Sequence, residues 1–368
     1  GLEQLEALGD ADELRRRHAE WFLDLAVAAE PHLTADDQGE WLDRCETEHA
    51  NLRAALRWAV EAGEVDRAQA AAGALWRFWQ QRGHLAEGRR WLEALLAPPL
   101  PQGRTAARAK ALTAAGGIAW WQEDMAAAQG FYKEALAIER ELGVQRGIAE
   151  ALYNQGFILG ARDDFDGAVR LFEESLELFR QVGDEPGMAR AEWMIMIRDL
   201  AAGDLDGTVA RAEAAVATWR RVGDRFLLGD GLVWLGVVYA RVGRRADARR
   251  AILQALDLIR EIDSPMGMVS VILGLAYVAR WEERHEDAMR LLGAGASLRE
   301  RVGGGAPINF LAGFMGDPEA EARAHLSREA AQRALDEGRA MGVDAALALA
   351  VGADAATGAP RDPSGGTG

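Results

Sequence analysis

Apolar residues return every three or four positions along most of the chain, with polar residues between them. This spacing is typical of amphipathic helices, and no segment alternates apolar and polar residues long enough to predict a strand. Short polar clusters interrupt the pattern, and their residue types suit tight turns and helix starts. The clusters between adjacent helices are Glu123-Asp124, Asp163-Asp164, Gly203-Asp204 and Gly243-Arg244. The pattern predicts an all-α protein.

The helical pattern repeats with a period of forty residues. Gly143, Gly183 and Gly223 are each forty residues apart, and Asp263 and Gly303 continue the series. Each of these positions suits the left-handed residue that ends a helix. Two more series keep the same register: Ala128, Ala168, Thr208, Ala248 and Ala288, and Tyr132, Phe172, Ala212, Ile252 and Leu292. Each unit is therefore predicted to be two antiparallel helices joined by a tight turn.

The small residues distinguish between the repeat classes that this period allows. HEAT and armadillo repeats have a similar length, but Leu235, Gly236 and Tyr239 followed by Ala248 and Ile252 match the tetratricopeptide pattern. Gly and Ala are expected there because the two helices of a pair cross closely. We predict an all-α, right-handed α-solenoid of tetratricopeptide-like helix pairs with a repeat of about forty residues.

The register divides the chain into four predicted regions. Residues 1–63 are predicted to form a helical segment, and 64–307 are predicted to form six helix pairs. Residues 308–350 are predicted to hold two short capping helices, which cover the apolar face of the last pair. The Gly-, Ala-, Ser- and Pro-rich tail, 351–368, is predicted to be disordered.

Charge and composition exclude several function classes. The formal net charge is −16, and an acidic chain repels phosphate backbones, which disfavours nucleic-acid binding by this segment. No stretch of 18 apolar residues predicts a membrane span, and no signal peptide opens the sequence. Cys45 is the single cysteine, which favours a reducing, cytoplasmic location.

The sequence contains no motif that would predict catalysis. Neither Lys110 nor Lys133 follows a glycine, so no phosphate-binding loop is present and we expect no ATP binding. No two histidines stand at metal-ligand spacing, and Glu46, Glu48 and His49 are more typical of a solvated acidic helix. We expect no catalytic residue, metal or cofactor in this chain.

The first helix of each pair is expected to line the concave side of a tetratricopeptide superhelix. The residues that the register places on that side are rich in Trp, Tyr and Arg, which are enriched at binding hot spots. The predicted concave binding surface comprises Arg77, Trp120, Trp121, Tyr153, Phe157, Trp193, Arg241, Tyr277, Arg280 and Trp281. The alternative is that these aromatic side chains pack between helices and belong to the core.

Several segments resemble one family of regulators. They are RRRHAEWFLDLA (15–26), CETEHANLRAALRWA (45–59), LWRFWQQRGHLAEGRRWLEALL (75–96), LLGAGASLRERVG (291–303) and EGRAMGVDAALALA (337–350). They are similar to the tetratricopeptide region of large actinobacterial LuxR- and SARP-type transcriptional regulators. In that family a STAND (NB-ARC-like) ATPase and a winged-helix module precede the repeats, so the resemblance implies that residues 1–63 link to a missing winged-helix and ATPase part. The chain departs from the family in the glycine-rich stretch 307–318, which is shortened.

The resemblance implies a non-catalytic sensor or interaction domain of a multidomain regulator. In one hypothesis the concave groove binds a protein segment, either the regulator's own ATPase module or a separate partner. In the other it binds a small-molecule inducer. A peptide groove is open and long, whereas an inducer site is a closed pocket of a few hundred Å³, so enclosure distinguishes the two hypotheses.

Overall fold

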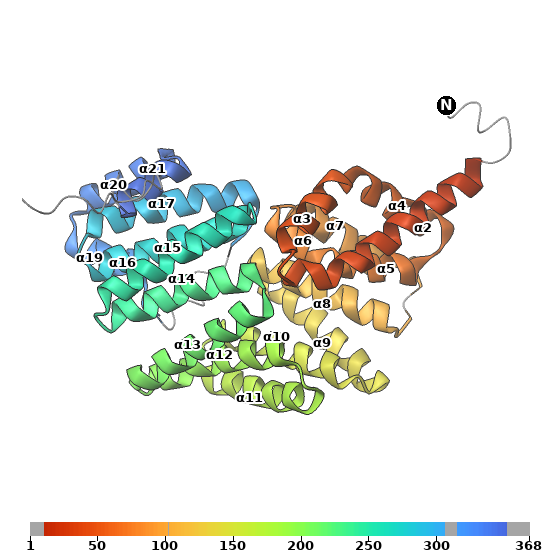
Figure 1. Ribbon diagram of the computed structural model, residues 1–368, viewed down its shortest axis with the longest axis horizontal. Helices are drawn as coiled ribbons and strands as arrows, with labels where there is room; N and C mark the ends of the chain where they lie inside the picture. The colour runs from red at the N-terminus through yellow and green to blue at the C-terminus, as the bar shows by residue number, and fades with distance from the viewer. Residues whose placement is uncertain (1–10, 102, 306–314, 352–368) are drawn as a thin grey trace, which may run out of the picture.

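A computed structural model describes residues 11–101, 103–305 and 315–351 of the chain. These residues form helices joined by short turns, and no strand occurs among them (Figure 1). The all-α prediction is therefore confirmed. The predicted tail falls outside the described residues except for Val351, as do residues 307–314 of the glycine-rich stretch.

Six helix pairs follow one another in the predicted forty-residue register. Pair one consists of a divided first helix, α5 (Val65–Ala74) and α6 (Trp76–Gln81), and a second helix, α7 (Leu85–Leu96). Pairs two to four are α8 (Ala106–Trp121) with α9 (Met125–Leu142), α10 (Gln145–Gly160) with α11 (Phe165–Val182), and α12 (Glu185–Ala201) with α13 (Leu205–Val222). Pairs five and six are α14 (Arg225–Arg241) with α15 (Arg245–Glu261), and α16 (Pro265–Trp281) with α17 (His285–Val302). The first helix of pair one differs from the others, because it is divided at Leu75.

The turn residues start and end these helices as their chemistry requires. Asp124, Asp164 and Asp204 each accept a hydrogen bond from the backbone amide three residues later, which caps the second helix of pairs two to four. Gly143 and Gly183 end α9 and α11 in the left-handed conformation, with φ of 70° and 69°. The repeat period seen in the sequence is therefore a period of helix caps.

Close helix crossings explain why small residues recur at one position of the first helices. A Cβ added to Gly156 would lie 2.4 Å from the Phe172 ring, and one added to Gly236 would lie 2.7 Å from Ile252. Both glycines let the first helix of a pair approach the second more closely than any side chain would allow. Pair four has Met196 at this position, the one that matches the repeat pattern least well.

Further helices flank the array at both ends. Before it lie α2 (Ala11–Ala29), the short 3₁₀ helix η1 (Glu30–Thr34), α3 (Gln38–Thr47) and α4 (His49–Ala62). After it come α19 (Pro318–His325), α20 (Arg328–Ala340) and α21 (Val343–Val351). Among the described residues that follow the array there are three helices where two were expected, because Ser327 caps a new helix after α19. The domain boundaries predicted from the sequence, at residues 63/64 and 307/308, stay a prediction.

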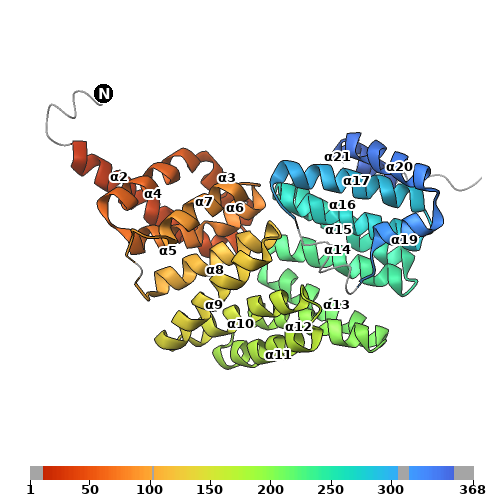
Figure 2. The same ribbon diagram turned by 180° about the vertical axis from the view of Figure 1, so that it is seen from behind.

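The superhelix curves until its N-terminal helices meet pairs five and six (Figures 1 and 2). Arg82, after α6, donates hydrogen bonds to the carbonyl oxygens of Ile262 (3.1 Å) and Asp263 (2.7 Å). Gln38 of α3 accepts a hydrogen bond from the backbone amide of Phe226 (3.0 Å). We call these contacts the seam. They close the concave side of the solenoid around a central space.

Candidate functional site

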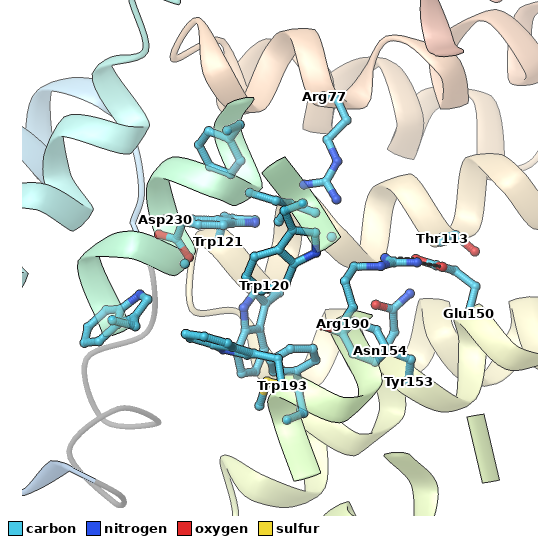
Figure 3. A pocket seen from close by; sticks show the side chains of 18 of the residues that line it. Arg77, Thr113, Trp120, Trp121, Glu150, Tyr153, Asn154, Arg190, Trp193 and Asp230 are labelled. Carbon is cyan, nitrogen blue, oxygen red and sulfur yellow. Dashed lines mark hydrogen bonds and ion pairs between the residues drawn. The ribbon is translucent and has the colours of Figure 1, made fainter. Parts of the chain in front are cut away.

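The central space contains a cavity of about 230 Å³. Its walls come mainly from the first helices of pairs one to five, namely α6, α8, α10, α12 and α14, which lie on the concave side (Figure 3). The volume lies just below the range of about 300–1,000 Å³ that is usual for drug-sized ligands. The cavity therefore suits a small ligand or the end of a chain.

Tryptophan dominates the cavity walls. Six of the twelve tryptophans of the chain line it: Trp76, Trp120, Trp121, Trp193, Trp219 and Trp234. Trp193 packs on Trp219 with ring centroids 5.2 Å apart, and Trp120 packs on Phe157 at 5.1 Å. Such walls offer rigid apolar area and the negatively polarised faces of aromatic rings.

A two-pronged ion pair crosses from α10 to α12 at the cavity. Arg190 donates to both carboxylate oxygens of Glu150, at 2.9 and 2.6 Å, and its guanidinium lies over the Tyr153 ring at 5.0 Å. Burial alone would raise the pKa of Glu150, but the charge and hydrogen bonds of Arg190, together with the charges of Arg77 and Arg146, outweigh burial and the pKa is lowered. Both groups are therefore charged, and they neutralise each other.

Arg77 enters the cavity from α6. Its guanidinium stacks on the Trp76 ring at 3.9 Å and donates to the Gln80 side chain at 2.9 Å. Burial lowers the pKa of Arg77, and the nearby carboxylate of Asp224 opposes this effect most strongly. Asp224 itself is 4% exposed and caps α14. Arg77 makes no ion pair within the part of the chain that the structure describes.

Asp230 on α14 is the least satisfied charged group of the cavity wall (Figure 3). Its Oδ1 atom is buried, and no described residue donates a hydrogen bond to it. Burial raises the pKa of Asp230 to about 6, although the side chains of Ser270 and Trp234 and the charge of Arg77 favour the ionised form. A strongly perturbed carboxyl group in a cavity marks a candidate functional site.

Six of the ten residues predicted for the concave surface line this cavity. They are Arg77, Trp120, Trp121, Tyr153, Phe157 and Trp193. Trp120 and Tyr153 line the cavity, as the groove interpretation predicts, but they are only 9% and 8% exposed, as the core interpretation predicts. The binding role of these six residues stays a prediction.

The other four predicted residues, Arg241, Tyr277, Arg280 and Trp281, lie outside the cavity lining. Tyr277 is fully buried and packs against Trp234, and Arg280 forms an ion pair with Glu321 of α19 at 2.7 Å. The expectation that Tyr277 faces solvent is therefore wrong. The reason is that α19 packs on α16 and covers the inner face of pair six.

Sequence reasoning missed the charged groups of the cavity as a set. Glu150, Arg190 and Asp230 occupy one position of the forty-residue register, in successive first helices. Lys110 holds the same position in pair two and forms an ion pair with Glu30 instead. The signal that could have revealed these groups was the recurrence of a charged residue at one position of successive first helices.

Two histidines and two glutamates lie together at the junction of α3, α4 and α7. The ligand atoms of Glu46, His49 and His84 lie within 4.8 Å of one another, a spacing that could hold a metal ion. Each histidine is already paired, because Nε2 of His49 lies 2.9 Å from Glu87 and that of His84 lies 2.9 Å from Glu46. These pairs explain the cluster without a metal, so the expectation of no metal stays a prediction.

None of the helices in the described residues is long and apolar enough to cross a membrane.

Comparisons with known proteins agree with the repeat architecture. A tetratricopeptide repeat family model matches residues 107–181. Proteins named as putative HTH-type transcriptional regulators, Rv0890c and MT0914 of Mycobacterium tuberculosis and Mb0914c of Mycobacterium bovis, are each 34% identical over 162 residues. Each match spans 40% of this chain and only 18% of the relative's length.

Two solved structures share the fold over most of the chain. One is NprR in complex with its cognate peptide NprX, with a TM-score of 0.54 and 15% identity, covering 91% of this chain and 94% of that one. The other is a Rap protein complexed with competence and sporulation factor, with a TM-score of 0.51 and 13% identity, covering 89% and 100%. The chain is thus an all-α solenoid of tetratricopeptide-like helix pairs.

Proposed function

We propose that this chain is a non-catalytic sensor domain of a larger transcriptional regulator and that its central cavity binds a small ligand or the end of a peptide. The observation that carries the proposal is the closure of the solenoid at the seam around a tryptophan-lined cavity. A ligand enclosed on several sides buries most of its surface, which gives a small molecule enough contact area for specific binding.

Enclosure favours a small ligand over a long protein segment in this space. The hydrogen bonds of Arg82 and Gln38 would have to break before an extended chain could pass through the concave side. A protein segment bound there, such as the ATPase module of the same regulator, remains the second candidate. The two structural neighbours described above are named as peptide or factor complexes, which favours that candidate for short peptides.

The regulator assignment is supported by the mycobacterial relatives and by the family resemblance. The matches cover 18% of those proteins, so a sensor domain of this size would leave room for the DNA-binding part and for a STAND-type ATPase. In this proposal a bound ligand alters the seam and thereby the surface that the N-terminal helices offer to the ATPase or winged-helix module. The assembly would act in the cytoplasm, and this domain would bind no nucleic acid, cofactor or membrane.

Tryptophan fluorescence and thermal stability test the proposal together. The chain is screened against amines, amino acids, sugars, nucleosides and short peptides, and a true ligand should raise the melting temperature and change the emission of the cavity tryptophans. Trp193→Ala should weaken binding, whereas Trp21→Ala, at a site that is 66% exposed and far from the cavity, should not. Equal weakening by both variants, or no ligand in any class, would contradict the proposal.

A second experiment examines the partner. The parent's ATPase module is tested for binding to this chain with and without the ligand found in the screen. A change in affinity on adding the ligand would support the sensor role. Unchanged affinity would refute coupling between the cavity and the ATPase.

A further inference from the structure

One carboxylate of the cavity wall, that of Asp230, forms no ion pair with any residue that the structure describes. Glu150 is paired with Arg190 through two hydrogen bonds, and Asp224 is the carboxylate whose charge most favours the ionised form of Arg77. Asp230 forms no ion pair within the described residues, and its Oδ1 atom lacks any donor. A buried carboxylate that has mainly the neutral side chains of Ser270 and Trp234 to stabilise its charge is costly to ionise, so a positively charged group from outside would be bound favourably.

The competing partner inside the protein is Arg77, which also lines the cavity. Its charge is the smallest of the influences on Asp230. The Arg77 guanidinium is held by its stack on Trp76 and by its hydrogen bond to Gln80. Arg77 therefore does not neutralise the Asp230 carboxylate.

The walls beside Asp230 also favour a cation. Trp121 and Trp234 line the cavity together with Asp230, and Trp193 and Trp219 continue the aromatic wall. Tryptophan faces attract positively charged groups, and this attraction is strongest where water is displaced. A neutral aromatic ligand would fill the same space, but it would leave the carboxylate oxygen without a donor.

From this arrangement we infer that the ligand carries an ammonium group, which donates a hydrogen bond to Asp230, on an apolar or aromatic body that packs against the tryptophans. The inference rests on the proposed function, because it names the chemical class of the ligand for the same cavity. The ammonium group can belong to a free organic amine or to the N-terminus of a peptide. Both sources share this chemistry, and the experiment separates them.

The test is isothermal titration calorimetry on the full chain with matched probes. Phenethylamine is compared with phenethyl alcohol, which has nearly the same shape without the charge. A Phe-Gly-Gly tripeptide with a free N-terminus is compared with its N-acetylated form. We expect the charged member of at least one pair to bind about tenfold or more tightly than its neutral counterpart, as a charge-assisted hydrogen bond provides. The pair that shows the preference identifies the source of the ammonium group.

Two variants test whether Asp230 causes the preference for the charged probe. Asp230→Asn keeps the side-chain shape and should remove the discrimination, whereas Asp257→Asn, at an exposed position of α15, should leave it unchanged. Retention of the preference in Asp230→Asn would overturn the inference.

Titration of the unmodified chain with the two probe pairs can refute the inference by itself. Equal affinity for both members of each pair would refute the ammonium group while leaving the cavity as a ligand site. Failure of all four probes to bind at millimolar concentration would also contradict the inference, and the broader screen would then decide the proposed function separately.

Discussion

Asp230 gives the most direct test of the physical reasoning in the absence of any ligand. Its pKa is raised from 3.8 to about 6 because burial disfavours the charged form. The folded protein therefore holds this proton more tightly than the unfolded chain does. The contribution of Asp230 to stability is most favourable below about pH 4 and falls as pH rises to about 6. The difference between the two pKa values corresponds to about 3 kcal/mol at pH 8, taken as an upper bound.

Asp230→Asn removes the charge and keeps the shape, so it should stabilise the ligand-free chain at pH 8 by up to about 3 kcal/mol. The gain should shrink to well under about 1 kcal/mol near pH 4, where the wild-type carboxyl group is protonated. Urea unfolding of both proteins across this range measures the difference. Asp257→Asn, on the exposed face of α15, serves as the control for general charge effects. An Asn variant that is no more stable at pH 8, or a gain independent of pH, would refute the burial of an unpaired charge.

Three further predictions concern the fold around the cavity. Gly236→Ala should lower the free energy of unfolding by about 1–3 kcal/mol, because the added Cβ would meet Ile252 at 2.7 Å. Gly130→Ala, in open space on α9, should raise the free energy of unfolding by about 0.5–1 kcal/mol. Thermal melts with the opposite order would show that the helix crossing is misplaced. Arg190→Met should cost up to about 3 kcal/mol in urea unfolding because it leaves Glu150 unpaired, and equal stability would mean that water screens this pair. Arg82→Met should speed hydrogen exchange of the backbone amides around residues 262–264 by opening the seam, and unchanged exchange there would show that the seam does not depend on this side chain.

Local features of the fold could be predicted from the sequence because they depend on residues close together in the chain. The Asp and Gly residues at the turns are recognisable by helix-cap chemistry alone. The glycines at the close crossings are recognisable because a crossing within one helix pair joins residues about sixteen apart, such as Gly156 and Phe172. The order and register of the six pairs follow from these short-range rules, as expected for a repeat array in which each unit contacts its neighbours.

The candidate site could be predicted only in part. The register predicted that Trp120, Trp121 and Trp193 share one concave surface, and all three line the cavity, while their binding role stays a prediction. It could not show that Tyr277 is covered, because α19 comes from a part of the chain without the repeat. Residues at equivalent register positions therefore had different surroundings.

The closure of the solenoid was decided by the tertiary structure alone. The seam joins Arg82 to Ile262 and Gln38 to Phe226, pairs separated by 180 and 188 positions in the sequence. Whether such distant units meet depends on a small rotation at each helix pair, which accumulates along the array and leaves no local pattern of residues. The same accumulation decides whether Asp230 faces open water or an enclosed cavity. The sequence by itself thus determined the helix pairs and their inner faces, while the tertiary structure brought those faces together around one charged and aromatic cavity.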